Sequence, residues 1–161
     1  MNVDVAALLD RLAGRGQTVA VAESLTGGLV VAALTDVAGA SRVVRGGVVA
    51  YATAVKADVV GVDPALLRRE GAVHPDVARA MAEGVRVLLS TTYGVATTGV
   101  AGPEPQDGSP VGEVHVAVAA PGGTRVHTLA VDPGLGRSGV RGEAVAAALE
   151  LLDAASREAL A

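Results

Sequence analysis

The chain has 161 residues, half of them apolar, so its length suits one domain with a single core. Its formal net charge is −4 and it has no Lys/Arg-rich run, which argues against a nucleic-acid surface because such a surface concentrates positive charge to neutralise phosphates. The absence of cysteine excludes disulfides and thiolate chemistry, and no apolar run approaches the roughly 20 residues of a membrane helix.

The first part of the chain alternates helical and strand patterns. Apolar residues at helical spacing before Gly14 predict an amphipathic helix, and its charged residues distinguish it from a signal peptide, so we expect a cytoplasmic protein that binds no membrane. A β-branched run then predicts a buried strand. The predicted elements are a helix over residues 3–14, a strand over 18–22, a helix over 29–37, a strand over 46–52 and a helical turn over 53–62.

The second part adds helices that begin at prolines and a hairpin around Pro121-Gly122-Gly123. The predicted elements are a helix from Asp63-Pro64, a helix from His74 to 89, strands over 93–99, 113–120 and 124–131, and a long helix from about 139 to 160. A Gly- and Pro-rich loop over 99–112 is long enough to be functional or mobile. The pattern predicts one domain, residues 1–161, of the α/β class: a three-layer α/β/α sandwich with a mixed, mostly parallel sheet, a C-terminal hairpin and a long last helix.

Ser24 is the first candidate for chemistry. It lies in a turn from a strand to a helix, and such turns present side chains at the carboxyl edge of the sheet, where open α/β folds bind ligands. The backbone N–H groups of Leu25, Thr26 and Gly27 are suited to receive an oxyanion or a phosphate. The alternative interpretation is structural, with Ser24 as a helix N-cap.

A serine nucleophile needs a base, and Lys56 is the candidate because it is the only lysine, the other twelve cationic side chains being arginine. At an unperturbed pKa only about 1 lysine in 2,500 is neutral at pH 7, so this role requires burial or a neighbouring cation. The alternative is a solvated lysine on a helix face. The histidines are weaker candidates: His74 is expected to be structural at a helix start, and His115 and His127 to lie on a half-exposed face of the hairpin.

Other polar residues are expected near the same sheet edge. Tyr51 ends the second predicted strand, where its hydroxyl could relay a proton, or its ring could simply fill the core. Thr98 and Gly99 end the third strand. Arg137 and Arg141 are four residues apart, so they share a helix face on which they could clamp a phosphate or remain solvated. Glu23 could orient the Ser24 loop or bind a ribose hydroxyl, and no spacing indicates a metal site.

Several motifs occur together in a fixed order: AESLTGG at 22–28, GGVVAYATAVK at 46–56, TGVAGP at 98–103 and VGEVHVAVA at 111–119. This series resembles the CinA C-terminal domain family, the bacterial nicotinamide-mononucleotide amidohydrolases. The resemblance covers nearly the whole chain. It implies a three-layer α/β domain, commonly dimeric or a higher homo-oligomer, that needs no metal or cofactor. The activity implied is hydrolysis of the carboxamide of nicotinamide mononucleotide to nicotinic acid mononucleotide and ammonia.

The family's motif residues fall on Ser24 as nucleophile, Tyr51 and Lys56 as base, Thr98 and Arg141. The residues expected to contact the nucleotide are Glu23, Thr26, Gly27, Gly28, Gly99, Arg137 and Arg141. The oxyanion is expected to bind backbone N–H groups near Thr26, Gly27 and Gly99 and the Thr98 hydroxyl. The sequence departs from the family pattern at Leu25, in the loop 104–112 and before Arg137, where the expected Asp is absent.

Two other functions stay open at this point. The chain could hydrolyse another small amide or ester, because nothing in the sequence recognises a pyridine ring. It could also be a non-catalytic nucleotide-binding or regulatory module that keeps the fold, although such a module has no need of a single lysine paired with a serine. A role on DNA finds no support in the charge or in the aromatic residues.

Overall fold

The computed structural model describes residues 3–158. Its α-helices and strands are α1 (Val5–Gly14), β1 (Val19–Glu23), α2 (Leu29–Thr35), β2 (Val44–Val49), α3 (Thr53–Asp58), α4 (Pro64–Glu70), α5 (Pro75–Leu88), β3 (Tyr93–Gly99), β4 (Glu113–Ala120), β5 (Gly123–Ala130) and α6 (Gly136–Glu158). Two short 3₁₀ helices cover Ala40–Arg42 and Pro133–Leu135. Every predicted helix and strand is present, with ends shifted by a few residues. The last two predicted helical residues, 159 and 160, lie outside the described part.

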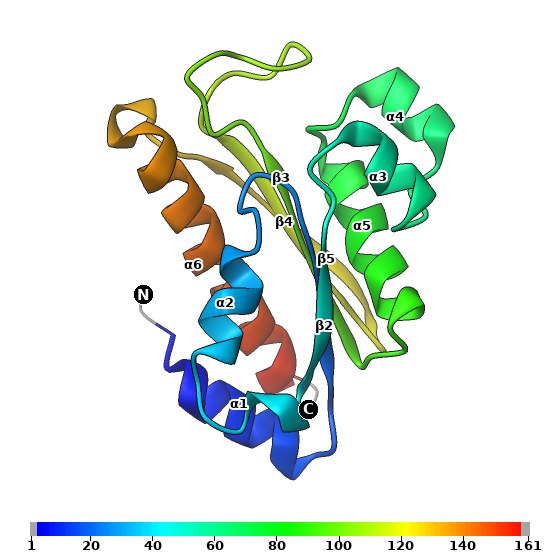
Figure 1. The fold of residues 1–161 in the computed structure, drawn as a ribbon, viewed down its shortest axis with the longest axis vertical. Coiled ribbons are helices and arrows are strands. Elements are labelled where there is room, and N and C mark those ends of the chain that lie inside the picture. Colours follow the sequence, from blue (N-terminus) through cyan, green and yellow to red (C-terminus); the bar gives the residue numbers. More distant parts are fainter. Residues whose placement is uncertain (1–2, 159–161) are drawn as a thin grey trace.

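The strands form one sheet in the order β2-β1-β3-β4-β5. β1 pairs in parallel with β2 and with β3, whereas β4 is antiparallel to both β3 and β5, so four of the five strands run in one direction. Helices α1, α2 and α6 cover one face of the sheet and α3, α4 and α5 cover the other (Figure 1). The predicted three-layer sandwich with a mixed sheet is therefore confirmed.

The two faces of the sheet carry side chains of different size. The face under α1, α2 and α6 is built largely of valine: Val19, Val21, Val95, Val114, Val116 and Val118. The face under α5 is built of Ala20, Ala22, Ala96, Ala117 and Ala119, with Gly94 among them. Because these side chains are small, α5 approaches β3 so closely that a Cβ on Gly94 would lie 2.0 Å from the carbonyl oxygen of Ala82.

Gly94→Ala is therefore expected to lower the free energy of unfolding by about 3 kcal/mol, because the helix and strand backbones must move apart. Urea unfolding followed by circular dichroism measures the change. Gly122→Ala is the matched control, since a Cβ there would meet nothing within 4 Å. Equal midpoints for the two variants would contradict the close approach of α5 to β3.

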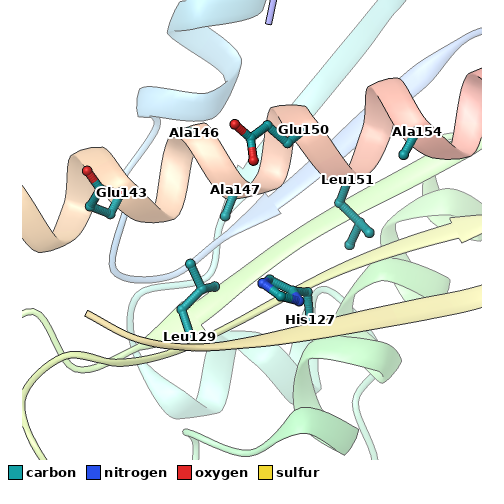
Figure 2. A pocket seen from close by; sticks show the side chains of 8 residues that line it. All are labelled: His127, Leu129, Glu143, Ala146, Ala147, Glu150, Leu151 and Ala154. Atoms are coloured by element: carbon teal, nitrogen blue, oxygen red, sulfur yellow. The ribbon is translucent and has the colours of Figure 1, made fainter. Parts of the chain in front are cut away.

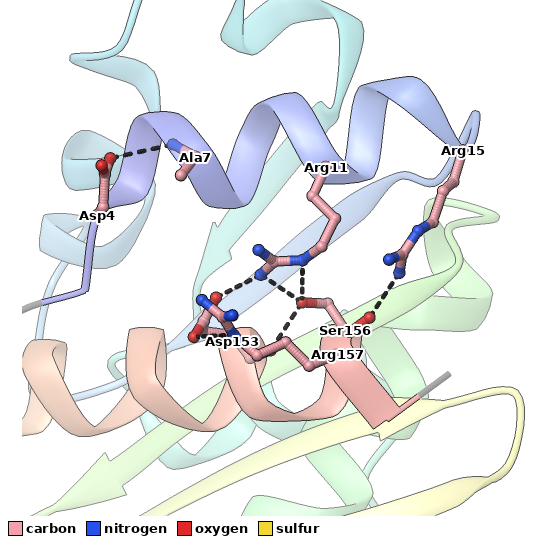
Figure 3. Close-up of polar contacts among 7 residues, drawn as sticks. All are labelled: Asp4, Ala7, Arg11, Arg15, Asp153, Ser156 and Arg157. Carbon is pink, nitrogen blue, oxygen red and sulfur yellow. Dashed lines mark hydrogen bonds and ion pairs between the residues drawn. The ribbon is translucent and has the colours of Figure 1, made fainter. Parts of the chain in front are cut away.

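A polar cluster ties α1 to the far end of α6 (Figure 3). The Arg11 guanidinium donates to the Ser156 hydroxyl, at 2.8 Å from Nη2, and forms an ion pair with Asp153. Arg15 donates to the Ser156 carbonyl at 2.6 Å, and Arg157 donates to Asp153 at 2.8 Å. These contacts hold the C-terminal part of α6 in place, while its first turn lies beside the carboxyl ends of the parallel strands.

Candidate active site

Ser24 follows β1 directly, at the edge of the sheet where β1, β2 and β3 all end. Its N–H donates to the Thr97 carbonyl at 3.0 Å, which continues the pairing of β1 with β3 by one residue. The Thr97 hydroxyl lies 2.7 Å from the hydroxyl of Thr26, which is in the loop that carries Ser24. The N-cap position of α2 is occupied by Gly28, which excludes the interpretation of Ser24 as the helix cap.

Glu23 holds the start of α2. Its carboxylate accepts the N–H groups of Gly28 at 3.0 Å, Val30 at 3.1 Å and Val31 at 2.9 Å, and its side chain is buried. Such a carboxylate supplies the hydrogen-bond acceptors that the first N–H groups of a helix lack. Its negative charge also interacts favourably with the positive end of the helix dipole. The structure thus places Glu23 beneath the Ser24 loop, in the orienting role, and away from the pocket that Ser24 faces.

Lys56 lies on α3 with only 1% of its surface exposed, so it is not a solvated lysine. Its Nζ lies 2.9 Å from Ser24 Oγ and donates to the Ala50 carbonyl at 2.7 Å. Burial lowers the pKa of Lys56 from 10.5 to about 8. At pH 7 about one molecule in ten then carries an uncharged Lys56, a fraction roughly 200 to 300 times that of an ordinary lysine.

A pocket of about 310 Å³ opens above Ser24. Its lining residues are Ser24, Leu25, Tyr51, Ala52, Thr53, Ala72, Val73, Thr98, Gly99, Gln106 and Arg137. They come from the ends of β1, β2 and β3, from the loop before α5, from the loop 99–112 and from the first turn of α6. The pocket therefore gathers segments that are far apart in the sequence, as an active site at this sheet edge does.

The loop that follows Ser24 and the end of β3 carry backbone N–H groups at the same sheet edge. Within the described residues, those of Leu25 and Thr26 donate to no protein acceptor, whereas that of Gly27 donates to the Ser24 carbonyl at 3.1 Å. Consecutive N–H groups of a strand point to opposite sides, and Val100 donates to Glu113 in β4, so the N–H of Gly99 points toward the end of β1. Among the described residues the N–H groups of Leu25 and Thr26, in the loop that follows Ser24, are therefore available as donors, and that of Gly99 faces the same sheet edge.

Thr98 is engaged elsewhere. Its hydroxyl donates to the Ala72 carbonyl at 2.7 Å, and the residue is 1% exposed. A hydroxyl has one proton, so this bond uses the Thr98 proton that was expected to be donated to the oxyanion. In the structure Thr98 fixes the loop before α5 against β3.

Tyr51 stands at the mouth of the pocket and is 61% exposed, so it does not fill the core. Its hydroxyl accepts from Arg137 Nη2 at 2.9 Å, and Arg137 Nη1 donates to the Gly102 carbonyl at 2.6 Å. The structure therefore places Tyr51 in the same pocket as Ser24, but its hydroxyl bonds Arg137 and neither Ser24 nor Lys56.

Arg141 reaches a different loop from Arg137. Its Nε donates to the Leu25 carbonyl at 2.9 Å and its Nη2 to the Thr26 carbonyl at 3.1 Å. Both arginines leave the first turns of α6 on the side of the Ser24 loop, as their spacing predicts, but only Arg137 lines the pocket.

The histidines lie outside this site. His74 caps α5, where its Nδ1 accepts the N–H of Asp76, so the structural interpretation is confirmed. His115 is 2% exposed, so its predicted half-exposed position is wrong: its ring bonds Thr128 and Glu113 in the sheet interior, and burial lowers its pKa. His127 lines a larger hollow of about 600 Å³ between β5 and α6, which contains no serine or lysine (Figure 2).

Residues 3–158 contain no group of three or more His, Cys, Asp or Glu side chains placed to hold a metal ion. None of the helices in the same range is long and apolar enough to cross a membrane.

Comparisons with known proteins agree with this fold. Residues 4–156 match the family model of the CinA C-terminal domain. A CinA-like protein from Frankia casuarinae is 53% identical over 145 residues, which are 90% of this chain and 33% of that protein. A CinA-like protein from Synechococcus is 51% identical over 146 residues, 90% of this chain and 35% of that protein. The chain thus spans about a third of the length of these curated relatives.

Solved structures resemble the chain over nearly its whole length. The competence/damage inducible protein CihA from Agrobacterium tumefaciens is 38% identical, with a TM-score of 0.85, and the match covers 94% of this chain and 95% of that one. A CinA superfamily protein from Klebsiella pneumoniae is 28% identical, with a TM-score of 0.89 and 96% of both chains covered.

Proposed function

The chain belongs to the CinA C-terminal domain family, and from this premise we propose that it is an amidohydrolase. The proposed reaction converts the carboxamide of nicotinamide mononucleotide to nicotinic acid mononucleotide and ammonia, with Ser24 as nucleophile and Lys56 as base. One observation carries the proposal: a buried lysine with its pKa lowered to about 8 has its Nζ 2.9 Å from a serine hydroxyl that faces a pocket. A buried lysine beside a serine activates it without a histidine.

In the first half-reaction, uncharged Lys56 takes the proton of Ser24 while Oγ attacks the amide carbon. The bond to the Ala50 carbonyl orients the amine. The N–H groups of Leu25, Thr26 and Gly99 stabilise the oxyanion, which usually makes a large contribution to such catalysis. Protonated Lys56 then returns its proton to the leaving nitrogen, and ammonia departs from an acyl-enzyme.

In the second half-reaction, water attacks the ester formed on Ser24. Lys56 accepts a proton from the water and later returns it to Ser24 Oγ, so the enzyme is regenerated and one carboxylic acid and one ammonia are formed per water consumed. Because the same lysine serves both halves, its pKa near the working pH suits it to give and take a proton.

The pocket suits a nucleotide amide. Leu25, Ala52 and Val73 provide apolar walls for a flat ring, and Gln106 adds a polar group. Arg137 is exposed at the mouth, where its guanidinium can exchange Tyr51 and Gly102 for a phosphate. Of the two arginines expected to bind phosphate, Arg137 is the one that lines the pocket.

Ammonia release in the presence of a chelator tests the proposal, with nicotinamide mononucleotide, its nucleoside and free nicotinamide as substrates. We expect turnover of the nucleotide, a higher KM for the nucleoside, because Arg137 loses the phosphate, and the slowest turnover for the free base. Added hydroxylamine should divert part of the product to a hydroxamate, as an acyl-enzyme requires.

Three results would overturn the proposed reaction in different ways. Faster hydrolysis of an unrelated small amide would assign a different substrate to the same site. Binding of the nucleotide by the folded protein without ammonia release would favour a binding module. Turnover without hydroxamate formation would favour direct attack by water.

A further inference from the structure

We propose that Arg141 is a positioning residue that fixes and polarises the oxyanion-binding N–H of Thr26, and that it does not bind the substrate phosphate. The proposal rests on the amidase function above. It starts from the two hydrogen bonds of Arg141, from Nε to the Leu25 carbonyl at 2.9 Å and from Nη2 to the Thr26 carbonyl at 3.1 Å.

The first of these bonds determines where an N–H group points. The carbonyl of Leu25 and the N–H of Thr26 belong to one planar trans peptide, in which they point in opposite directions. When Arg141 holds the carbonyl on its own side, the N–H of Thr26 is held pointing away from α6. This N–H donates to no acceptor in the described structure, and it lies in the loop that carries Ser24.

The second bond explains the glycine that follows. Gly27 has φ +60°, in the left-handed region, and a Cβ there would lie 3.3 Å from Arg141 Nη2. Glycine thus allows the turn and leaves room for the guanidinium. The planar fork of arginine spans two successive carbonyls, which the single ammonium of lysine does not.

The charge of Arg141 acts through the same peptide. A cation at the carbonyl oxygen draws electron density from the amide, which makes the N–H on its other end a stronger donor. This strengthening of the N–H donor is largest when an oxyanion forms at it. The guanidinium charge then lies at the carbonyl end of the peptide and the negative charge of the oxyanion at its N–H end. Arg141 thus stabilises the transition state without touching the substrate.

The helix that carries Arg141 is firmly held. Val140 and Ala144 on either side of it are fully buried in the core, and the far end of α6 is tied to α1 by Arg11. Arg137, four residues earlier, lines the pocket, whereas Arg141 does not. Arg137 therefore contacts the substrate, and Arg141 holds the loop that carries Ser24.

Kinetics of Arg141→Gln and Arg141→Lys on the nucleotide and its nucleoside test this role, with Arg137→Gln for comparison. We expect Arg141→Gln to lower kcat about 10²-fold for both substrates, the size expected when an oxyanion donor is misplaced, with little change in KM. Arg141→Lys should not restore kcat, since it cannot hold both carbonyls. Arg137→Gln should raise KM for the nucleotide alone. A loss confined to KM for the nucleotide in Arg141→Gln would overturn the inference.

A second readout separates this inference from the amidase proposal. A fluorophosphonate reacts with an activated serine and places its phosphonyl oxygen where the oxyanion forms, whatever the natural substrate. We expect Ser24 labelling to slow about 10²-fold in Arg141→Gln, with the pH midpoint set by Lys56 unchanged. Equal labelling of wild type and Arg141→Gln would refute the role of Arg141 alone. An unlabelled wild type that also releases no ammonia would refute both proposals.

Discussion

Ser24→Ala is expected to release ammonia from nicotinamide mononucleotide at least about 10⁴ times more slowly than the wild type. The variant keeps the pocket, Lys56 and the backbone donors but lacks the oxygen that forms the acyl-enzyme. Losing the serine of a hydrolase typically costs this much or more, and the oxyanion donors account for the residual rate. Single-turnover measurements with enzyme in excess would quantify the change.

Ser41→Ala is the matched control, because it makes the same chemical change in the exposed turn between α2 and β2. It should keep the wild-type rate. Formation of hydroxamate should vanish in Ser24→Ala and persist in Ser41→Ala. If Ser24→Ala retained a tenth of the wild-type rate, Lys56 would have to activate water directly, and the covalent route would be lost.

Ser24 and Lys56 could each be predicted as candidates from the sequence for physical reasons, whereas their contact is seen only in the structure. A β-branched run followed by a glycine-rich turn places Ser24 at the carboxyl edge of the sheet, and the next strand and turn bring Lys56 to the same edge. Lys56 is also the single lysine in a chain that otherwise uses arginine. This indicates a candidate base, because of the two only lysine can release its proton near neutral pH.

The partners supplied by the backbone could not be predicted. Ala50 and Ala72 offer carbonyls to Lys56 and Thr98, and any residue has a carbonyl, so the residue type carries no signal. The orientation of Tyr51 could not be predicted for a related reason. β2 ends at Val49, two residues before it, so the alternation of the strand no longer decides where the ring points.

His115 shows where strand alternation misleads. The hairpin pattern suggested an exposed face, but β4 lies between β3 and β5 and has helices over both sides, so its whole central part is buried. Strands covered on both faces require both sets of side chains to be buried. A polar side chain there needs partners, and His115 finds them in Thr128 and Glu113.

Lys56→Met is expected to abolish turnover to about the same extent as Ser24→Ala, since the nucleophile loses its base. Wild-type kcat/KM should rise about tenfold per pH unit below pH 8 and level off above it, because only uncharged Lys56 accepts the proton and burial lowers its pKa to about 8. A wild-type profile that is flat between pH 6 and 8 would remove Lys56 as the base.

Lys56→Met is expected to remove activity without lowering stability at pH 7. The folded pKa of Lys56 is about 8 and the ordinary value is 10.5, so the unfolded chain binds more protons between these values, and wild-type stability rises with pH across that window. Well below pH 8 the folded protein bears the full cost of the buried charge, about 3 kcal/mol from the lowering of the Lys56 pKa. Methionine removes that cost but leaves the Ala50 carbonyl without its donor, which costs about 1–3 kcal/mol.

At pH 7 the inactive Lys56→Met variant should therefore be as stable as the wild type or more stable, by up to about 2 kcal/mol from these opposing contributions. Its stability relative to the wild type should fall by about 2 kcal/mol between pH 7 and pH 10, because the wild type regains what the buried charge cost it. Urea unfolding of both proteins at the two pH values measures this difference. A constant difference would mean that Lys56 keeps an ordinary pKa in the folded protein, and the proton needed for catalysis would then have to move through another group.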